Sequence, residues 1–81
     1  MAKKVIQSAI PTSNIITDEK DLGVFIKHKR TTLGYTLEQT AQLCNISYRT
    51  LSKLENGFEG TRMSTALYVA HMLGLKLEIV S

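Results

Sequence analysis

The sequence predicts a mostly α-helical domain of four to five helices, followed by a C-terminal β-strand that pairs across a dimer. Between residues 17 and 74, apolar residues recur at the spacing of buried helix faces, and polar cap residues and glycines separate these segments. From residue 75 onward apolar and charged residues alternate, which is typical of a half-buried strand. With 81 residues the chain can form one small domain only, so we expect a partner surface to complete its modest core.

Composition and charge narrow the class of protein. The formal net charge is +3, and five of the cations but only two of the acids lie between residues 27 and 55, which weakly indicates a polyanionic partner. A single cysteine, Cys44, excludes an intramolecular disulfide framework. The first residues lack the apolar stretch of a secretory signal, and no segment is long enough to span a bilayer. We therefore expect a cytoplasmic protein without a membrane partner.

The first helix follows an N-terminal arm. Residues 1–16 show no helical period and are interpreted as an arm or a short strand. Either Thr17 or Asp18 is a suitable N-cap for the helix, and Gly34 offers the left-handed conformation that ends it. Its apolar residues, at helical spacing, are Leu22, Phe25, Ile26 and Leu33.

A second helix and a tight turn follow. Thr36 and Gln39 have the spacing of a capping box, and Asn45 tolerates the left-handed conformation of a turn. The predicted buried stripe of this helix is Leu37, Ala41 and Cys44. A short turn forces two helices to cross closely, so the small Ala41 four residues before Asn45 predicts a helix-turn-helix.

The third helix has the composition of a recognition helix. Ser47 can cap it, Gly57 can close it, and Ile46, Leu51 and Leu54 fix it to the domain. The side chains left pointing outward are Tyr48, Arg49, Ser52 and Lys53. Arginine can bond guanine O6 and N7 at once, lysine can reach guanine or phosphate, and tyrosine can contact a thymine methyl group. Backbone N–H groups at the start of such a helix suit a phosphate.

The fourth helix and the tail complete the chain. We expect Thr61 to cap a helix that ends at Gly74, with an inward face of Met63, Ala66, Leu67, Ala70 and Leu73. The tail, "LKLEIV", would then place Leu75, Leu77 and Ile79 on one face of a strand. Because a lone strand leaves backbone groups unpaired, we favour pairing with a second copy over folding back on the same domain.

The segments "GYTLEQTAQLCNISYRTLSKLENG" (34–57) and "ALYVAHMLGL" (66–75) resemble the Xre/Cro-type helix-turn-helix family, which has a lambda-repressor-like fold. The resemblance implies that Tyr48, Arg49 and Lys53 read bases and that Ser47 and Asn56 touch phosphates. The full predicted DNA-binding set is Ser47, Tyr48, Arg49, Ser52, Lys53, Asn56, Thr36 and Lys27.

Some positions depart from the family or admit two interpretations. Leu37 stands where the family usually has a glutamine near the DNA backbone, and Thr40 replaces a usual leucine. The cations Lys27, Lys29 and Arg30 form either a solvated face or phosphate contacts, and Arg30 can instead pair with Glu55.

The tail after the fourth helix is similar to the HipB-like branch of the family. The pattern along the chain predicts three parts: an arm (1–16), a DNA-binding domain (17–74) and a dimerisation strand (75–81). The resemblance to the HipB-like branch implies a homodimeric antitoxin that represses its own operon at a double-stranded DNA operator and binds a HipA-like kinase toxin. A toxin surface is expected on the arm or on the outer fourth helix, at Tyr68, His71 and Met72.

Other function classes stay open at this stage. A stand-alone phage-type repressor and a protein-interaction module without DNA contacts are the alternatives. Enzymatic activity is not expected, because the sequence shows no phosphate-binding loop, catalytic carboxylate pair or nucleophile elbow. No cofactor or metal is expected either, because His28 and His71 lie far apart without further ligands at metal-binding spacing.

Overall fold

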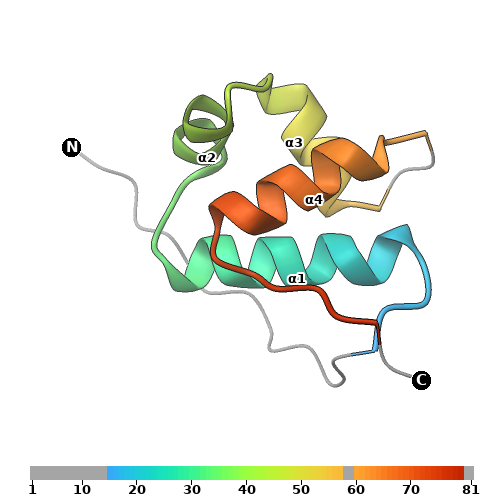
Figure 1. Ribbon diagram of the computed structural model, residues 1–81. Coiled ribbons are helices and arrows are strands. Elements are labelled where there is room, and N and C mark those ends of the chain that lie inside the picture. Colours follow the sequence, from blue (N-terminus) through green and yellow to red (C-terminus); the bar gives the residue numbers. More distant parts are fainter. Residues whose placement is uncertain (1–14, 58–59, 80–81) are drawn as a thin grey trace.

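The computed structural model describes residues 15–57 and 60–79, and the predicted arm therefore lies almost wholly outside the described residues. Four helices fill this part of the chain: α1 (Glu19–Thr32), α2 (Leu37–Cys44), α3 (Tyr48–Glu55) and α4 (Met63–Met72). α3 packs against both α1 and α2, and α4 packs against α1 and α2. Figure 1 shows α4 running alongside α1, with α2 and α3 together on one side of them. The mostly helical prediction is confirmed.

The start of α1 is fixed by a reciprocal set of short-range hydrogen bonds. Asp18, and not Thr17, is the N-cap, and its carboxylate accepts a bond from the Asp21 backbone N–H at 2.9 Å. The Asp21 carboxylate in turn accepts bonds from the Thr17 backbone N–H at 2.9 Å and the Thr17 hydroxyl at 2.8 Å. The bonds from Thr17 stabilise the ionised carboxylate, and the bond from its backbone N–H has the largest effect. They hold the pKa of Asp21 below its ordinary value.

A glycine with positive φ follows the C-cap residue of both α1 and α4. After α1, Gly34 has φ 79°, and the Tyr35 N–H donates back to the carbonyl of Arg30 at 3.1 Å. After α4, Gly74 has φ 83°, and the Leu75 N–H donates to the carbonyl of Ala70 at 2.9 Å. Both ends are Schellman motifs, in which only glycine adopts the left-handed conformation without strain.

The turn between α2 and α3 has the predicted geometry. Thr36 and Gln39 form a complete capping box, with bonds of 2.8 and 3.1 Å. Asn45 has φ 56° and ψ 44°, and the next N–H, that of Ile46, donates to the Ala41 carbonyl at 3.0 Å. Ala41 is buried. A small residue at the crossing and a left-handed residue four positions later therefore make this helix pair.

The core lies between the helices, and among the described residues ten buried hydrophobic ones form it: Leu22, Ile26, Ala41, Cys44, Leu51, Leu54, Ala66, Val69, Ala70 and Leu73. For α4 the sequence prediction was partly wrong. Arg62, not Thr61, is the N-cap, and Met63 and Leu67 are 57% and 44% exposed whereas Val69 is fully buried. Residues 66, 69, 70 and 73 share one face, and Leu67 projects about 100° away from Ala66 around the axis.

The tail is described as far as residue 79. Leu75 packs partly against the core, Leu77 is exposed and Ile79 is fully exposed. No β-strand forms within 15–57 and 60–79 of this single chain. Because a lone strand has no partner for its backbone groups, pairing with a second copy stays a prediction.

Candidate nucleic-acid interface

The outward face of α3 carries the predicted base-reading side chains. Leu51 and Leu54 are buried, so the opposite face of the same helix is turned away from the core. Tyr48 is half exposed, Arg49 and Lys53 are exposed, and Ser52 is partly buried. Neither cation pairs with an acidic side chain of the described residues. This face therefore presents two cations and a phenol to solvent.

The start of α3 is a compact polar cap. The Ser47 hydroxyl accepts a bond from the Thr50 backbone N–H at 3.0 Å, and the Ser47 and Thr50 hydroxyls lie 2.8 Å apart. Both the cap and Tyr48 lie immediately after the turn at Asn45, so the turn sets where the N-terminal half of α3 projects. Five predicted residues, Ser47, Tyr48, Arg49, Ser52 and Lys53, thus belong to one short helix and its cap.

The C-terminal end of α3 is held by a buried ion pair. Arg30 Nε lies 2.6 Å from Glu55 Oε2, and Arg30 Nη2 donates to Glu55 Oε1 at 3.1 Å. Arg30 Nη1 also donates to the carbonyl of Tyr35 at 2.7 Å, in the segment before α2. Of the three interpretations of Arg30, pairing with Glu55 is therefore the correct one. A bidentate guanidinium–carboxylate pair fixes direction as well as distance, so it orients α3 on α1.

The remaining predicted residues lie away from this face or have bonds of their own. Thr36 uses its hydroxyl to cap α2, and Asn56 donates from its side-chain amide to the Ser52 carbonyl at 2.8 Å. Lys27 is exposed on α1. Contacts of these residues with DNA stay predictions.

One residue beside α3 was missed by the sequence reasoning. Arg62 and Lys53 line the same open hollow of about 400 Å³, together with Thr50, Leu54, Gly60, Thr61 and Thr65. Arg62 is exposed and, as N-cap of α4, makes no side-chain capping bond. The sequence could have shown this residue, because it places an arginine at the start of a helix. The positive end of the helix dipole disfavours a cation there unless an anion is bound nearby.

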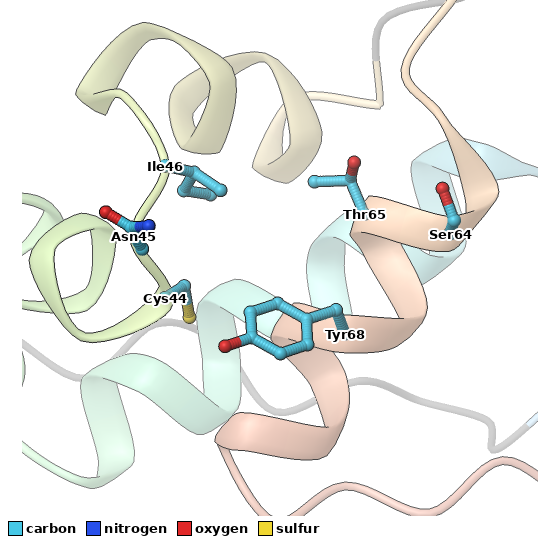
Figure 2. A pocket seen from close by; sticks show the side chains of 6 residues that line it. All are labelled: Cys44, Asn45, Ile46, Ser64, Thr65 and Tyr68. Atoms are coloured by element: carbon cyan, nitrogen blue, oxygen red, sulfur yellow. The ribbon is translucent and has the colours of Figure 1, made fainter.

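A second hollow, of about 350 Å³, lies between the α2–α3 turn and α4 and shares Thr65 with the first. Figure 2 shows Cys44, Asn45 and Ile46 of the turn facing Ser64, Thr65 and Tyr68 of α4, with the Tyr68 ring reaching toward Cys44. Burial raises the pKa of the Cys44 thiol above its ordinary value, so the thiol is a core group and not an activated nucleophile. Tyr68 is half exposed and His71 is exposed, so the outer face of α4 is open to a partner.

The described residues offer little for other kinds of site. Within 15–57 and 60–79 no three His, Cys, Asp or Glu side chains gather where they could hold a metal ion. No helix in these same ranges has the length and apolar character needed to cross a membrane.

Comparison with known families decides the class of this fold. The model of the helix-turn-helix family matches residues 26–80, which include α2, the turn, α3 and α4. The chain belongs to the helix-turn-helix family. A comparison with curated proteins found no match.

Solved structures of similar fold include HipB in several complexes. A HipB variant in complex with the O2 20-mer is 23% identical, with a TM-score of 0.76 over 86% of this chain and 97% of that chain. HipB in complex with the O4 20-mer and the HipA–HipB–O2–O3 complex have the same identity and TM-score over 85% of this chain. This helix-turn-helix protein therefore shares the fold of HipB, and its family and fold are those of DNA-binding regulators.

Proposed function

We propose that the protein is a sequence-specific transcriptional repressor whose helix α3 lies in the major groove of an operator. The observation that carries this proposal is the tight turn at Asn45 followed by an outward face of Tyr48, Arg49 and Lys53, whose cations have no acidic partner among the described residues. A fork of N–H donors on Arg49 suits guanine, and Lys53 suits guanine or phosphate. Arg62 lines a hollow with Lys53, which supports an additional phosphate contact there.

The proposal includes a homodimer formed through the tail. One recognition helix touches only a few base pairs, whereas a two-fold dimer reads two half-sites roughly 34 Å apart. Leu77 and Ile79 are exposed apolar side chains in the single chain, and Leu75 is only partly buried. Pairing of residues 75–80 from two copies would cover part of these side chains and satisfy the backbone groups along the shared edge of the two strands.

We also propose that the repressor is the antitoxin of a HipBA-like pair that acts in the cytoplasm and represses its own operon. The support is its fold, which is that of HipB in a solved HipA–HipB–O2–O3 complex. The exposed residues Leu67, Tyr68 and His71 belong to α4 and not to α3. A kinase toxin bound to them would leave α3 free to bind DNA. A stand-alone repressor would lack such a partner.

DNA binding is tested by selecting a preferred duplex from a random library with the full-length protein. The affinity of the parent for the selected duplex should fall linearly on a log–log plot against salt concentration. Arg49→Ala should weaken this affinity by about 1–3 kcal/mol and relax preference at one base pair in each half-site. Lys20→Ala, which removes one exposed charge from α1, is the matched control and should keep the base preference.

The results separate the candidate functions. If Arg49→Ala bound the selected duplex as tightly as the parent, the assignment of α3 to the major groove would be wrong. If the parent bound no duplex in a salt-dependent manner but did bind a protein, the chain would be an interaction module.

The toxin proposal needs its own experiment. Co-expression with the product of the neighbouring reading frame, followed by purification at high salt, should recover a complex. Tyr68→Ala should weaken that complex, whereas Arg49→Ala should leave it intact because Arg49 lies on α3. Recovery of the protein alone at high salt would contradict the antitoxin proposal and leave the repressor proposal standing.

A further inference from the structure

Helix α1 approaches the end of α3 more closely than any side chain would allow. At Gly23, a buried residue of α1, an added Cβ would lie 2.5 Å from the carbonyl oxygen of Leu54 and 2.6 Å from that of Glu55. Contacts below 3.0 Å require a neighbour to move, and here the neighbours are backbone atoms that cannot rotate aside. The absence of a side chain at residue 23 therefore sets the distance between these two helices.

Neighbouring contacts hold the same end of α3 from two further directions. Gly57, two residues after the end of α3, has φ 67°, and its added Cβ would overlap the Lys20 backbone of α1. Arg30, seven residues after Gly23 and so on the same face of α1, grips the Glu55 carboxylate. The C-terminal end of α3 is thus packed directly against α1, whereas the turn at Asn45 fixes the position of its N-terminal end.

We propose that Gly23 is a positioning residue for DNA recognition, because it sets the tilt of α3 about the turn. This inference rests on the proposed function of α3. An alanine Cβ at residue 23 would need about 0.9 Å more room to reach an ordinary contact of 3.4 Å. Over the roughly 12 Å length of an eight-residue helix, that displacement corresponds to a tilt of about 4°.

The tilt has an uneven effect along α3. The displacement grows with distance from the turn, so Lys53 moves further than Arg49, which lies in the first helical turn. Hydrogen bonds to base edges weaken steeply when distance and angle are lost, whereas phosphate contacts by flexible cations adapt. A tilted α3 therefore loses base preference first at the position that Lys53 contacts, and keeps its salt-dependent binding.

The experiment compares Gly23→Ala with Val24→Ala, a control on the exposed side of the same helix. Each full-length variant is titrated with the duplex selected by the parent and with a shuffled duplex, at a temperature where circular dichroism shows it folded. Gly23→Ala should reduce the ratio of the two affinities roughly tenfold, the weight of one good base contact, with an unchanged salt slope. Val24→Ala should keep the parent's ratio.

A second variant keeps the test decisive if Gly23→Ala does not fold. Arg30→Lys keeps the charge but loses the bidentate fork to Glu55, so it loosens the same end of α3 without adding an atom to the contact. It should lose preference at the same base pair. A folded Gly23→Ala, or in its place a folded Arg30→Lys, with the parent's ratio of affinities for the selected and shuffled duplexes would overturn the inference. A parent protein that selects no sequence would instead refute the proposed function.

Discussion

Thr40→Val should make the protein more stable, because the Thr40 hydroxyl is buried without a hydrogen bond. Thr40 is 0% exposed, and its Oγ1 has no hydrogen-bond partner among the residues that the structure describes. Leaving a buried polar group unsatisfied costs about 1–3 kcal/mol, and valine replaces the hydroxyl with a methyl group of similar shape. Threonine and valine also have similar helix propensities.

The expected gain at the lower end of that range is about 1 kcal/mol in the free energy of unfolding. For a domain of this size, such a gain corresponds to a rise in Tm of roughly 4–8 °C. Thermal and urea unfolding, followed by circular dichroism, measure both quantities. The urea midpoint should rise without a change in slope, because the surface exposed on unfolding stays the same.

Thr31 provides a matched control for this substitution. It is also a buried helical threonine, but its hydroxyl donates to the carbonyl oxygens of Lys27 at 2.9 Å and His28 at 3.0 Å. Thr31→Val should therefore lower the free energy of unfolding by about 0.5–1.5 kcal/mol, the net contribution of such a hydrogen bond. If Thr40→Val were no more stable than the parent, the Thr40 hydroxyl must have a partner, and the reasoning from burial would fail.

Two further predictions concern the tail and the start of α1. Truncation after Gly74 should give a monomer or a poorly folded chain with little specific DNA affinity. Sedimentation of the truncated protein, together with a DNA titration, checks this. A folded dimer with unchanged affinity would assign the tail another role. Because its folded-state pKa is lowered, the Asp21 carboxylate stabilises the fold above its ordinary pKa of 3.8, and this contribution is lost as the pH falls through the folded value. The urea midpoint of Asp21→Asn should therefore lie below that of the parent at neutral pH and converge with it in acid; a constant difference down to the lowest pH would contradict the bonds from Thr17.

Several features of the site were predictable because the bonds that make them are short in sequence. The capping box of Thr36 and Gln39, the cap at Ser47 and the left-handed Asn45 each involve partners within four residues. Such bonds form wherever the local chain allows them, so residue type and spacing are enough to predict them. The outward face of α3 followed in the same way from the positions of Leu51 and Leu54.

Other features depended on which helix lies opposite, and local patterns leave that open. The sequence offered Arg30 either phosphate or Glu55 as a partner, and only the packing of α1 on α3 brought that carboxylate within 2.6 Å. Leu67 and Val69 are both apolar, and the position of α4 against its neighbours decided that Val69 is buried.

By itself, the sequence determined the helices, the caps of α2 and α3, the turn and the polar face of α3, since these follow from hydrogen bonds and periodicity within a few residues. The tertiary structure alone decided that a Cβ at residue 23 would clash with the backbone of α3. It also decided that the Thr40 hydroxyl has no hydrogen-bond partner among the described residues. A glycine inside a helix is locally only a weak helix former, and a threonine is locally an ordinary polar residue. At Gly23 the backbone of a helix distant in sequence leaves no room for a side chain, because distances between helices are set by packing and not by local preference.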